Sequence, residues 1–140
     1  MDDHKQIGEA AERTGLSLRT IRYYEEVGLI TPSARSHGGF RLYTDSDIAR
    51  LMLVKRMKPL GFSLDEMRDL LSVLDELDRA DLEPAARASA HERLGMFEAA
   101  ADERCASLRS QLETAEEFAH SLRRESRQQA RHHESAGQDQ

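Results

Sequence analysis

Apolar residues recur at helical spacing along most of the chain, and breaks in this pattern divide it into short elements. Residues 7–14 carry apolar side chains at positions i, i+3 and i+4, and Gly15 follows them as a stop. A second short helix is predicted between Ser17, whose hydroxyl can accept hydrogen bonds from the first turn, and Gly28, which suits the left-handed conformation that ends helices. Two short helices joined by a turn that contains glycine form a helix-turn-helix.

The second of these helices separates an apolar face from a polar one. Ile21 and Tyr24 lie one turn apart and are expected to face inward. Arginine binds phosphate oxygens and guanine edges through paired hydrogen bonds, so the polar face is typical of a recognition helix in the major groove. The alternative is a solvated surface helix with ordinary charges. The residues expected on the outward face are Arg19, Thr20, Arg22 and Tyr23.

The stretch 29–44 has a different pattern, which predicts a small hairpin. Pro32 disfavours a helix, and Gly38-Gly39 is typical of a hairpin turn. The predicted strands are residues 29–30 on one side of this turn and 40–43 on the other. Such a hairpin after a helix-turn-helix is called a wing, and its arms would carry Arg35 and Arg41.

Two further helices are predicted after the wing. Thr44 or Asp45 caps the first of them. Ser63 opens the second, and Glu66 three residues later completes a capping box. Leucine and methionine recur at spacings of three and four as far as residue 77, which indicates a helix packed against its neighbours.

A long helix is predicted from Pro84 to residue 128, and its apolar residues recur every seven positions, as in a coiled coil. At about 1.5 Å per residue it would be roughly 65 Å long, and it cannot bury such a stripe on itself. A second copy related by two-fold symmetry is expected to cover the stripe, although the helix could instead fold back on its own head. The residues expected in this dimer seam are Leu94, Phe97, Ala101, Cys105, Leu108, Leu112, Ala115 and Leu122.

The charges are unevenly distributed along the chain. The 140 residues have a formal net charge of −6, which taken alone argues against nucleic-acid binding. Residues 13–62, however, contain nine Lys or Arg and only four Asp or Glu. A basic head followed by an acidic remainder is compatible with DNA binding by the head.

Composition also bears on location and chemistry. The single cysteine excludes an internal disulfide, no apolar run approaches the length of a membrane span, and the first residues lack a signal-peptide pattern, so we expect a cytoplasmic protein without a membrane partner. The sequence contains no nucleophile–base constellation, phosphate loop or set of metal ligands, so we expect neither an enzyme nor a cofactor. His132-His133 is too short and too polar a segment to count as a metal site, and we expect no metal.

Several sequence words resemble those of the MerR family of bacterial transcription regulators. They are I-G-E-A-A-E-R-T-G, T-I-R-Y-Y-E-E-V-G-L-I, G-G-F-R-L-Y, D-I-A-R-L and G-F-S-L-D-E-M, all between residues 7 and 77. The resemblance implies a mainly α fold. A winged helix-turn-helix DNA-binding domain (1–77) and a linker (78–83) would precede a long antiparallel coiled-coil dimerisation helix (84–128). The polar residues 129–140 lack periodicity and are predicted to be disordered.

The resemblance also implies roles for individual residues. Arg19 and Arg22 would make major-groove contacts, and Lys58 would reach a phosphate. The DNA backbone would be held by Tyr24 and by the wing residues Arg35 and Arg41. Phe40 stands where many members carry tyrosine, so it lacks a hydroxyl for a hydrogen bond to DNA. Two alternatives remain open at this point: Tyr24 is mainly a core residue, or Phe40 only pins the wing.

The function implied by the resemblance is that of a homodimer that binds double-stranded promoter DNA. It would grip two half-sites across an over-long promoter spacer, and bend and untwist the duplex so that RNA polymerase finds both of its recognition elements on one face. The alternatives are a plain repressor with the same head and an adaptor whose coiled coil binds another protein. Metal-sensing relatives carry paired cysteines near the end of the dimer helix, and drug-sensing relatives carry a large C-terminal ligand domain. We expect neither feature here, so the sequence does not indicate which signal the regulator would sense. In an antiparallel pair, Cys105 could approach Cys105 of the partner and act as a thiol switch. The alternative is that Cys105 is only a small buried apolar residue.

Overall fold

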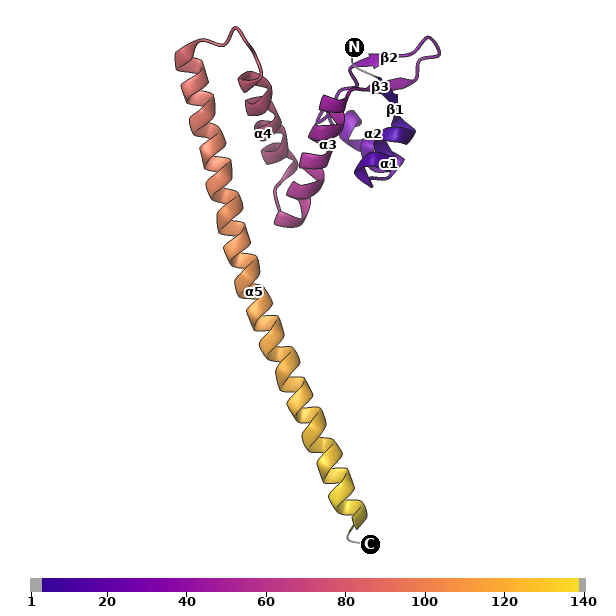
Figure 1. Cartoon of the computed structure of the whole chain (residues 1–140), viewed down its shortest axis with the longest axis vertical. Coiled ribbons are helices and arrows are strands. Elements are labelled where there is room, and N and C mark those ends of the chain that lie inside the picture. Colours follow the sequence, from indigo (N-terminus) through magenta and orange to yellow (C-terminus); the bar gives the residue numbers. More distant parts are fainter. Residues whose placement is uncertain (1–3, 139–140) are drawn as a thin grey trace. The chain divides into compact units, whose positions relative to one another are not determined.

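The computed structural model describes residues 4–138 and is mainly helical, as predicted (Figure 1). A small sheet of three strands accompanies the helices. The elements in chain order are β1 (Lys5–Gln6), α1 (Ile7–Thr14), α2 (Leu18–Glu26), β2 (Ala34–Arg35), β3 (Arg41–Tyr43), α3 (Asp45–Met57), the 3-10 helix η1 (Lys58–Leu60), α4 (Leu64–Leu77) and α5 (Pro84–Gln138).

The chain forms two compact units, and the boundary between them falls inside α5, after Glu98. The first unit contains every other element together with the beginning of α5. The second unit consists of the remainder of α5.

The two short helices of the predicted helix-turn-helix are present, and their ends are determined by local side chains. The hydroxyl of Ser17 accepts a hydrogen bond of 3.0 Å from the backbone N–H of Thr20, which confirms Ser17 as the N-cap of α2. Gly15 and Gly28 follow the two helices with φ angles of +74° and +76°. Glycine adopts this left-handed region without the steric cost that a Cβ would bring, so both predicted stops are confirmed.

The wing is present, but its first strand lies elsewhere than predicted. The strand predicted at residues 29–30 is wrong, since Leu29 and Ile30 are buried and donate backbone hydrogen bonds to the Tyr24 carbonyl at the end of α2. The strand that pairs with β3 is β2, with Ala34 opposite Leu42 and Arg35 opposite Arg41. On its other side β3 pairs with β1, a strand of two residues that the pattern did not predict.

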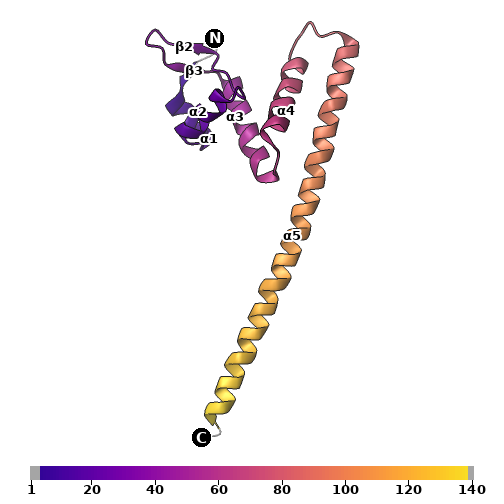
Figure 2. The same cartoon turned by 180° about the vertical axis from the view of Figure 1, so that it is seen from behind.

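The helices after the wing begin at the predicted caps. Thr44 and Ser63 each accept a hydrogen bond from the backbone N–H three residues later. The carboxylates of Asp47 and Glu66 in turn accept one from the backbone N–H of Thr44 and Ser63. Within the first unit, α3 lies between α4 on one side and α1 and α2 on the other (Figure 2). Arg50 ties α3 to α4 through ion pairs with Asp75 and Asp78. The largest fully buried side chains of this unit are Tyr43, Ile21, Leu51, Val54, Val73 and Thr14.

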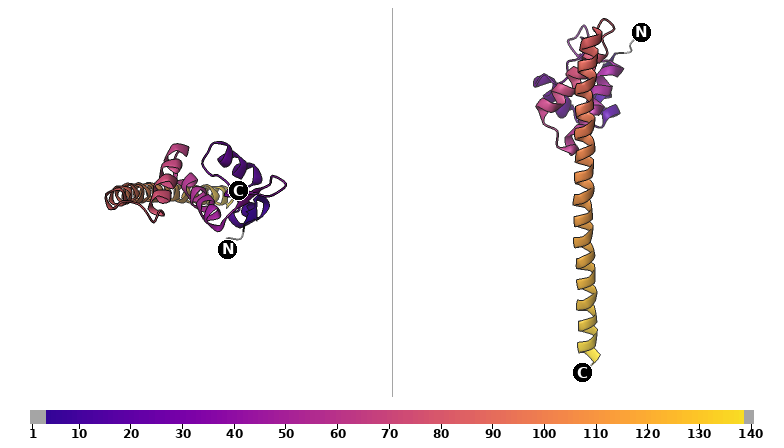
Figure 3. Two further views of the ribbon diagram at one scale, coloured as in Figure 1. Left: turned by 90° about the horizontal axis from the view of Figure 1, so that it is seen from above. Right: turned by 90° about the vertical axis from the view of Figure 1, so that its left-hand side faces the viewer.

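The long helix α5 begins at Pro84 as predicted but extends further than predicted. It is unbroken to Gln138 (Figure 3), so the disordered tail predicted for residues 129–140 is wrong for 129–138. Asp139 and Gln140 lie outside the described residues. Glutamine, arginine and alanine favour helices, and the Gln129 side chain donates a hydrogen bond of 3.0 Å to Glu125 one turn earlier. A polar composition therefore does not end this helix.

Candidate nucleic-acid interface

The polar face of α2 is exposed as predicted. The side chains of Arg19 and Arg22 are exposed, Thr20 is half-buried, and half of the Tyr23 surface is accessible. Ile21 on the opposite face is fully buried, so the orientation of the helix about its axis is fixed by packing. Because packing fixes the helix, the guanidinium groups of Arg19 and Arg22 remain on its exposed side, where they are available to a ligand.

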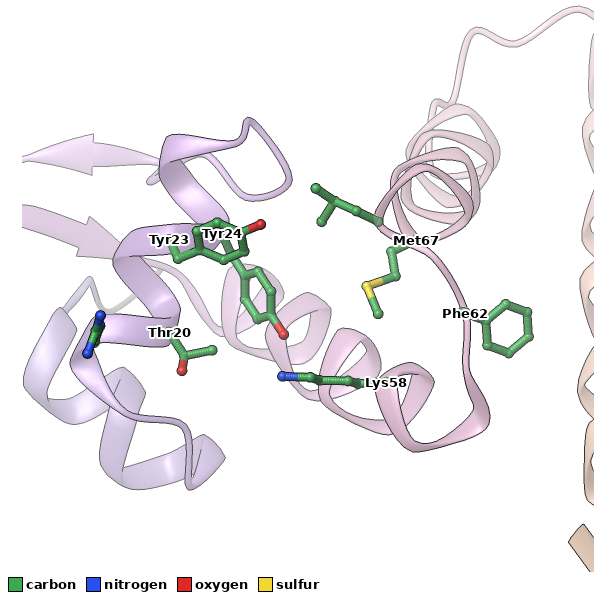
Figure 4. Close-up of a pocket in the computed structure, with 8 residues that line it drawn as sticks. Thr20, Tyr23, Tyr24, Lys58, Phe62 and Met67 are labelled. Atoms are coloured by element: carbon green, nitrogen blue, oxygen red, sulfur yellow. The ribbon is translucent and has the colours of Figure 1, made fainter.

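One side of this face opens into a groove of about 470 Å³ (Figure 4). Arg19 and the side chains of Thr20, Tyr23 and Tyr24 line it from α2, and Lys58 extends towards them from the start of η1. The apolar floor comes from the start of α4 and the loop before it. The residues of that floor are Phe62, Leu64 and Met67.

The two neighbouring tyrosines of α2 differ in their surroundings. Tyr24 is only 5% exposed, and its burial, together with the nearby Tyr23, raises the pKa of its phenol. The two rings are inclined at 47° with centroids 6.0 Å apart. Tyr24 is thus a core residue, as the alternative interpretation held, and its ring also lines the groove that contains Lys58.

A second groove lies on the other side of the same face, towards the wing. Arg41 of β3 lines it together with residues of α2, so the structure brings the predicted recognition helix and wing into one surface. The lining residues of α2 are Arg19, Arg22, Tyr23, Glu25 and Glu26. Phe40 is 63% exposed at the hairpin turn and does not pin the wing by burial. Lys58, the arginines of α2 and the wing therefore follow one another around α2.

Glu25 connects the wing to α2 and was not singled out by its position in the sequence. Its Oε1 lies 3.2 Å from Nη2 of Arg35, and its Oε2 forms an ion pair with Nε of Arg41. The hydroxyl of Tyr43 donates to Oε2 over 3.4 Å. Burial and the adjacent Glu25 carboxylate raise the pKa of Tyr43 to about 12, so this phenol keeps its proton at neutral pH.

The basic side chains of the first unit differ in whether they have a partner. Many of them have carboxylate partners, for example Arg13 with Asp45 and Arg93 with Glu76. The side chains of Arg19, Arg22 and Lys58 have no ion pair or hydrogen bond within the described residues 4–138. These three cations line the two grooves around α2, whereas Lys55, Arg56 and Arg87, which also have no carboxylate partner within the described residues, line neither groove.

Metal-binding groups and membrane-spanning helices are two further features that the described part of the chain could contain. Within residues 4–138 no three His, Cys, Asp or Glu side chains are grouped so that they could hold a metal ion. None of the helices in this part of the chain combines the length and the apolar character that crossing a membrane requires.

Comparison with known proteins identifies relatives of both parts of the chain. A family model described as MerR HTH family regulatory protein matches residues 6–74, and a second one, described as MerR, DNA binding, matches residues 48–124, which is more than half of the chain. An uncharacterized HTH-type transcriptional regulator of Pseudomonas aeruginosa is 42% identical over 87 residues, which cover 62% of this chain and 66% of the relative. The HTH-type transcriptional regulator HmrR of Rhizobium leguminosarum is 49% identical over 74 residues, 53% of this chain and 57% of HmrR. The chain thus spans less than two thirds of the length of these relatives.

A solved structure shares the fold over most of the chain. It is that of HiNmlR, described as a MerR family regulator lacking the sensor domain, bound to promoter DNA. The TM-score is 0.64 at 24% sequence identity, and the match covers 83% of this chain and 84% of the other.

Proposed function

The chain belongs to the MerR family, and on that basis we propose that it is a cytoplasmic transcription regulator that binds promoter DNA as a homodimer. Arg19 and Arg22 of α2 enter the major groove, while Lys58 on one side and the wing on the other hold the phosphate backbone. Thr20 and Tyr23 border the base edges and Tyr24 borders the backbone. Phe40 contacts the backbone through its ring alone.

The single observation that carries this proposal is the set of three unpaired cations around α2. A lone guanidinium or ammonium group on a protein surface is not by itself evidence for DNA binding. Arg19, Arg22 and Lys58 instead line adjoining grooves, in a unit where many other basic groups have carboxylate partners. Phosphates of a duplex would supply the missing counter-charges and release their own counterions, so binding is expected to weaken steeply with salt.

The proposed bending and untwisting of the duplex requires a homodimer. The stripe of α5 exposes Leu108 (44%), Leu112 (57%) and Leu122 (55%), and a second α5 in antiparallel orientation would cover them. The half-buried members of the same stripe, Leu94, Phe97, Ala101 and Cys105, precede these leucines along the helix. Two heads held at a fixed separation would then bend and untwist the duplex between their half-sites, and RNA polymerase would engage the realigned promoter.

The first experiment tests DNA recognition. Sites bound in the genome are mapped, and duplexes carrying them are titrated with the wild-type protein, with Arg19→Ala and with Arg109→Ala. Arg109 is an exposed arginine of α5 with no described partner, so both variants lose one charge from an exposed side chain. We expect Arg19→Ala to weaken binding roughly 5- to 150-fold, as for an arginine that contacts a base, and Arg109→Ala to leave it unchanged.

The two outcomes separate a regulator from an adaptor. If Arg19→Ala binds the mapped duplexes as tightly as Arg109→Ala does, the recognition role of α2 is wrong. The spacing between promoter elements at the mapped sites tests the untwisting mechanism on its own. Spacers of ordinary length would exclude that mechanism and leave DNA binding intact.

A further inference from the structure

The two arginines of the wing stand directly opposite each other in the sheet. Arg35 of β2 and Arg41 of β3 are register partners, and both guanidinium groups reach the same carboxylate of α2. Like charges placed directly across a strand pair repel each other. Without a carboxylate between them, these two side chains would therefore separate, and the hairpin would lose both ion pairs to α2.

Glu25 is well placed to prevent this separation. It lies in the last turn of α2, and its side chain is only 16% exposed, whereas those of Arg35 and Arg41 are 54% and 31% exposed. The carboxylate is thus covered by the guanidinium groups that it binds. Arg35 is fixed a second time by a hydrogen bond of 3.1 Å from its Nη1 to the carbonyl of Gly39 in the hairpin turn.

The ion pairs leave part of each arginine available for a ligand. A guanidinium group has five N–H donors in a rigid plane, and Glu25 and Gly39 occupy only some of them. Two guanidinium groups around one carboxylate also keep a net positive charge. The wing can therefore bind a phosphate while Glu25 still holds it.

We propose that Glu25 is a positioning residue for DNA recognition, which holds Arg35 and Arg41 at a fixed place beside the recognition helix. This inference rests on the proposed function and concerns its specificity. A wing in a fixed position can bind the backbone only when α2 is in register with its own bases. A loose wing binds the backbone of any sequence equally well, so the preference for the mapped sites falls when Glu25 is lost.

The test compares charge with geometry at two adjacent positions. Glu26 is the matched control because it is exposed, follows Glu25 in the same helix, and has no described partner. Dissociation constants are measured for a mapped site and for a random duplex with the wild-type protein and with Glu25→Gln, Glu26→Gln, Glu25→Asp and Glu26→Asp. The readout is the dissociation constant for the random duplex divided by that for the mapped site, which we call the specificity ratio.

The expected results differ between the two positions. Removing a negative charge strengthens binding to any duplex, so Glu26→Gln tightens both constants together and keeps the specificity ratio. Glu25→Gln is expected to tighten non-specific binding in the same way but to lower the specificity ratio about five- to tenfold, because the wing side chains must be ordered on binding. Glu25→Asp keeps the charge and shortens the reach to the arginines, so it lowers the ratio without tightening non-specific binding.

Further results would contradict the inference about Glu25, or show whether that inference or the proposed function itself is wrong. A double-mutant cycle with Arg35→Ala must be non-additive if Glu25 acts through that arginine, and additive effects would exclude the proposed coupling. Should Glu25→Gln not fold, Glu25→Asp decides, and a specificity ratio equal to that of Glu26→Asp would contradict the inference. A wild-type protein that prefers no duplex would refute the proposed function itself, whereas a selective wild-type protein with equally selective Glu25 variants would refute only the role of Glu25.

Discussion

The ammonium group of Lys55 donates a hydrogen bond of 2.6 Å to the backbone carbonyl of Thr14. Lys55 belongs to α3, and Thr14 is the last residue of α1, where carbonyl groups have no partner within their own helix. A positive charge at this position is also favourable to the dipole of α1. Through this contact α3 holds the end of α1 and the turn that leads into α2, and so the base of the recognition helix.

Gly15 follows Thr14, and replacing it with alanine is expected to destabilise the protein. Its φ angle is +74°, and a Cβ there would lie 2.8 Å from the Lys55 ammonium group. The left-handed conformation costs a residue with a Cβ about 1–2 kcal/mol, and the lysine must also move away from its carbonyl. Urea denaturation of Gly15→Ala should show a loss of this size in the free energy of unfolding.

Gly8 provides the matched control for this glycine substitution. It lies inside α1 with open space where a Cβ would be, so Gly8→Ala should stabilise the protein by up to about 1 kcal/mol. Equal stability of the two alanine variants would show that the Lys55–Thr14 contact places no constraint on the turn.

Stability is expected to fall at high pH because of Tyr43. Burial and Glu25 raise its pKa to about 12 in the folded protein, against 10.0 for an unperturbed phenol. The neutral phenol therefore favours the folded state, its contribution is complete below pH 10, and it is lost as the pH rises towards 12. The linkage relation gives a loss of roughly 1 kcal/mol between pH 10 and pH 11.

The measurement is urea denaturation at several pH values for the wild-type protein and for Tyr43→Phe. Lysine side chains titrate in the same range, so only the difference between the two proteins reports on the phenol. We expect the two curves of stability against pH to converge above pH 10. Parallel curves up to pH 11.5 would mean that Tyr43 ionises as easily in the folded protein as in the unfolded chain.

Phe40 allows a test of the wing by the addition of one hydroxyl. Its ring is 63% exposed, so Phe40→Tyr should leave stability unchanged. If the ring contacts the DNA backbone, the new hydroxyl can donate to a phosphate, and binding to a mapped site should tighten about two- to tenfold, the usual range for one hydrogen bond. Phe118 is similarly exposed on α5, at 65%, and Phe118→Tyr should not change the affinity for DNA. Equal affinities of the two variants would place Phe40 away from the duplex.

Elements that depend on local signals could be predicted from the sequence, and those that depend on distant contacts could not. Ser17, Ser63 and Thr44 act through the N–H of a residue three positions later, so their neighbours in the chain were enough to predict three helix starts. The strand β1, at Lys5–Gln6, exists only because β3 lies beside it, and two residues carry no periodicity. A short apolar pair such as Leu29-Ile30 fits a strand as well as a buried helix end, and packing decided between them.

The same distinction applies to the site. Arg19 and Arg22 could be predicted because helical spacing alone places them opposite Ile21. Glu25 could not, since its partners are 10 to 18 residues away on the wing. Alternation along the second strand of the hairpin puts Arg41 and Tyr43 on one face, which is the only signal that could have led to their shared acceptor.

The proposed dimer can be tested by placing one charge on the exposed stripe of α5. Leu112 is 57% exposed, and in the proposed pair it would be covered by the partner helix. Leu112→Glu would bury a carboxylate without a counter-charge in that seam, which proteins tolerate poorly, so we expect the dimer to dissociate in sedimentation experiments. Gln111→Glu adds the same charge at the adjacent exposed position and should remain dimeric.

Binding to a full mapped site should weaken in Leu112→Glu alone, because a single head has only half of the phosphate contacts and a correspondingly shallower dependence on salt. A helix that folds back on its own head gives the opposite pattern: both variants and the wild-type protein would then sediment as single chains, and the seam proposed for α5 would be wrong.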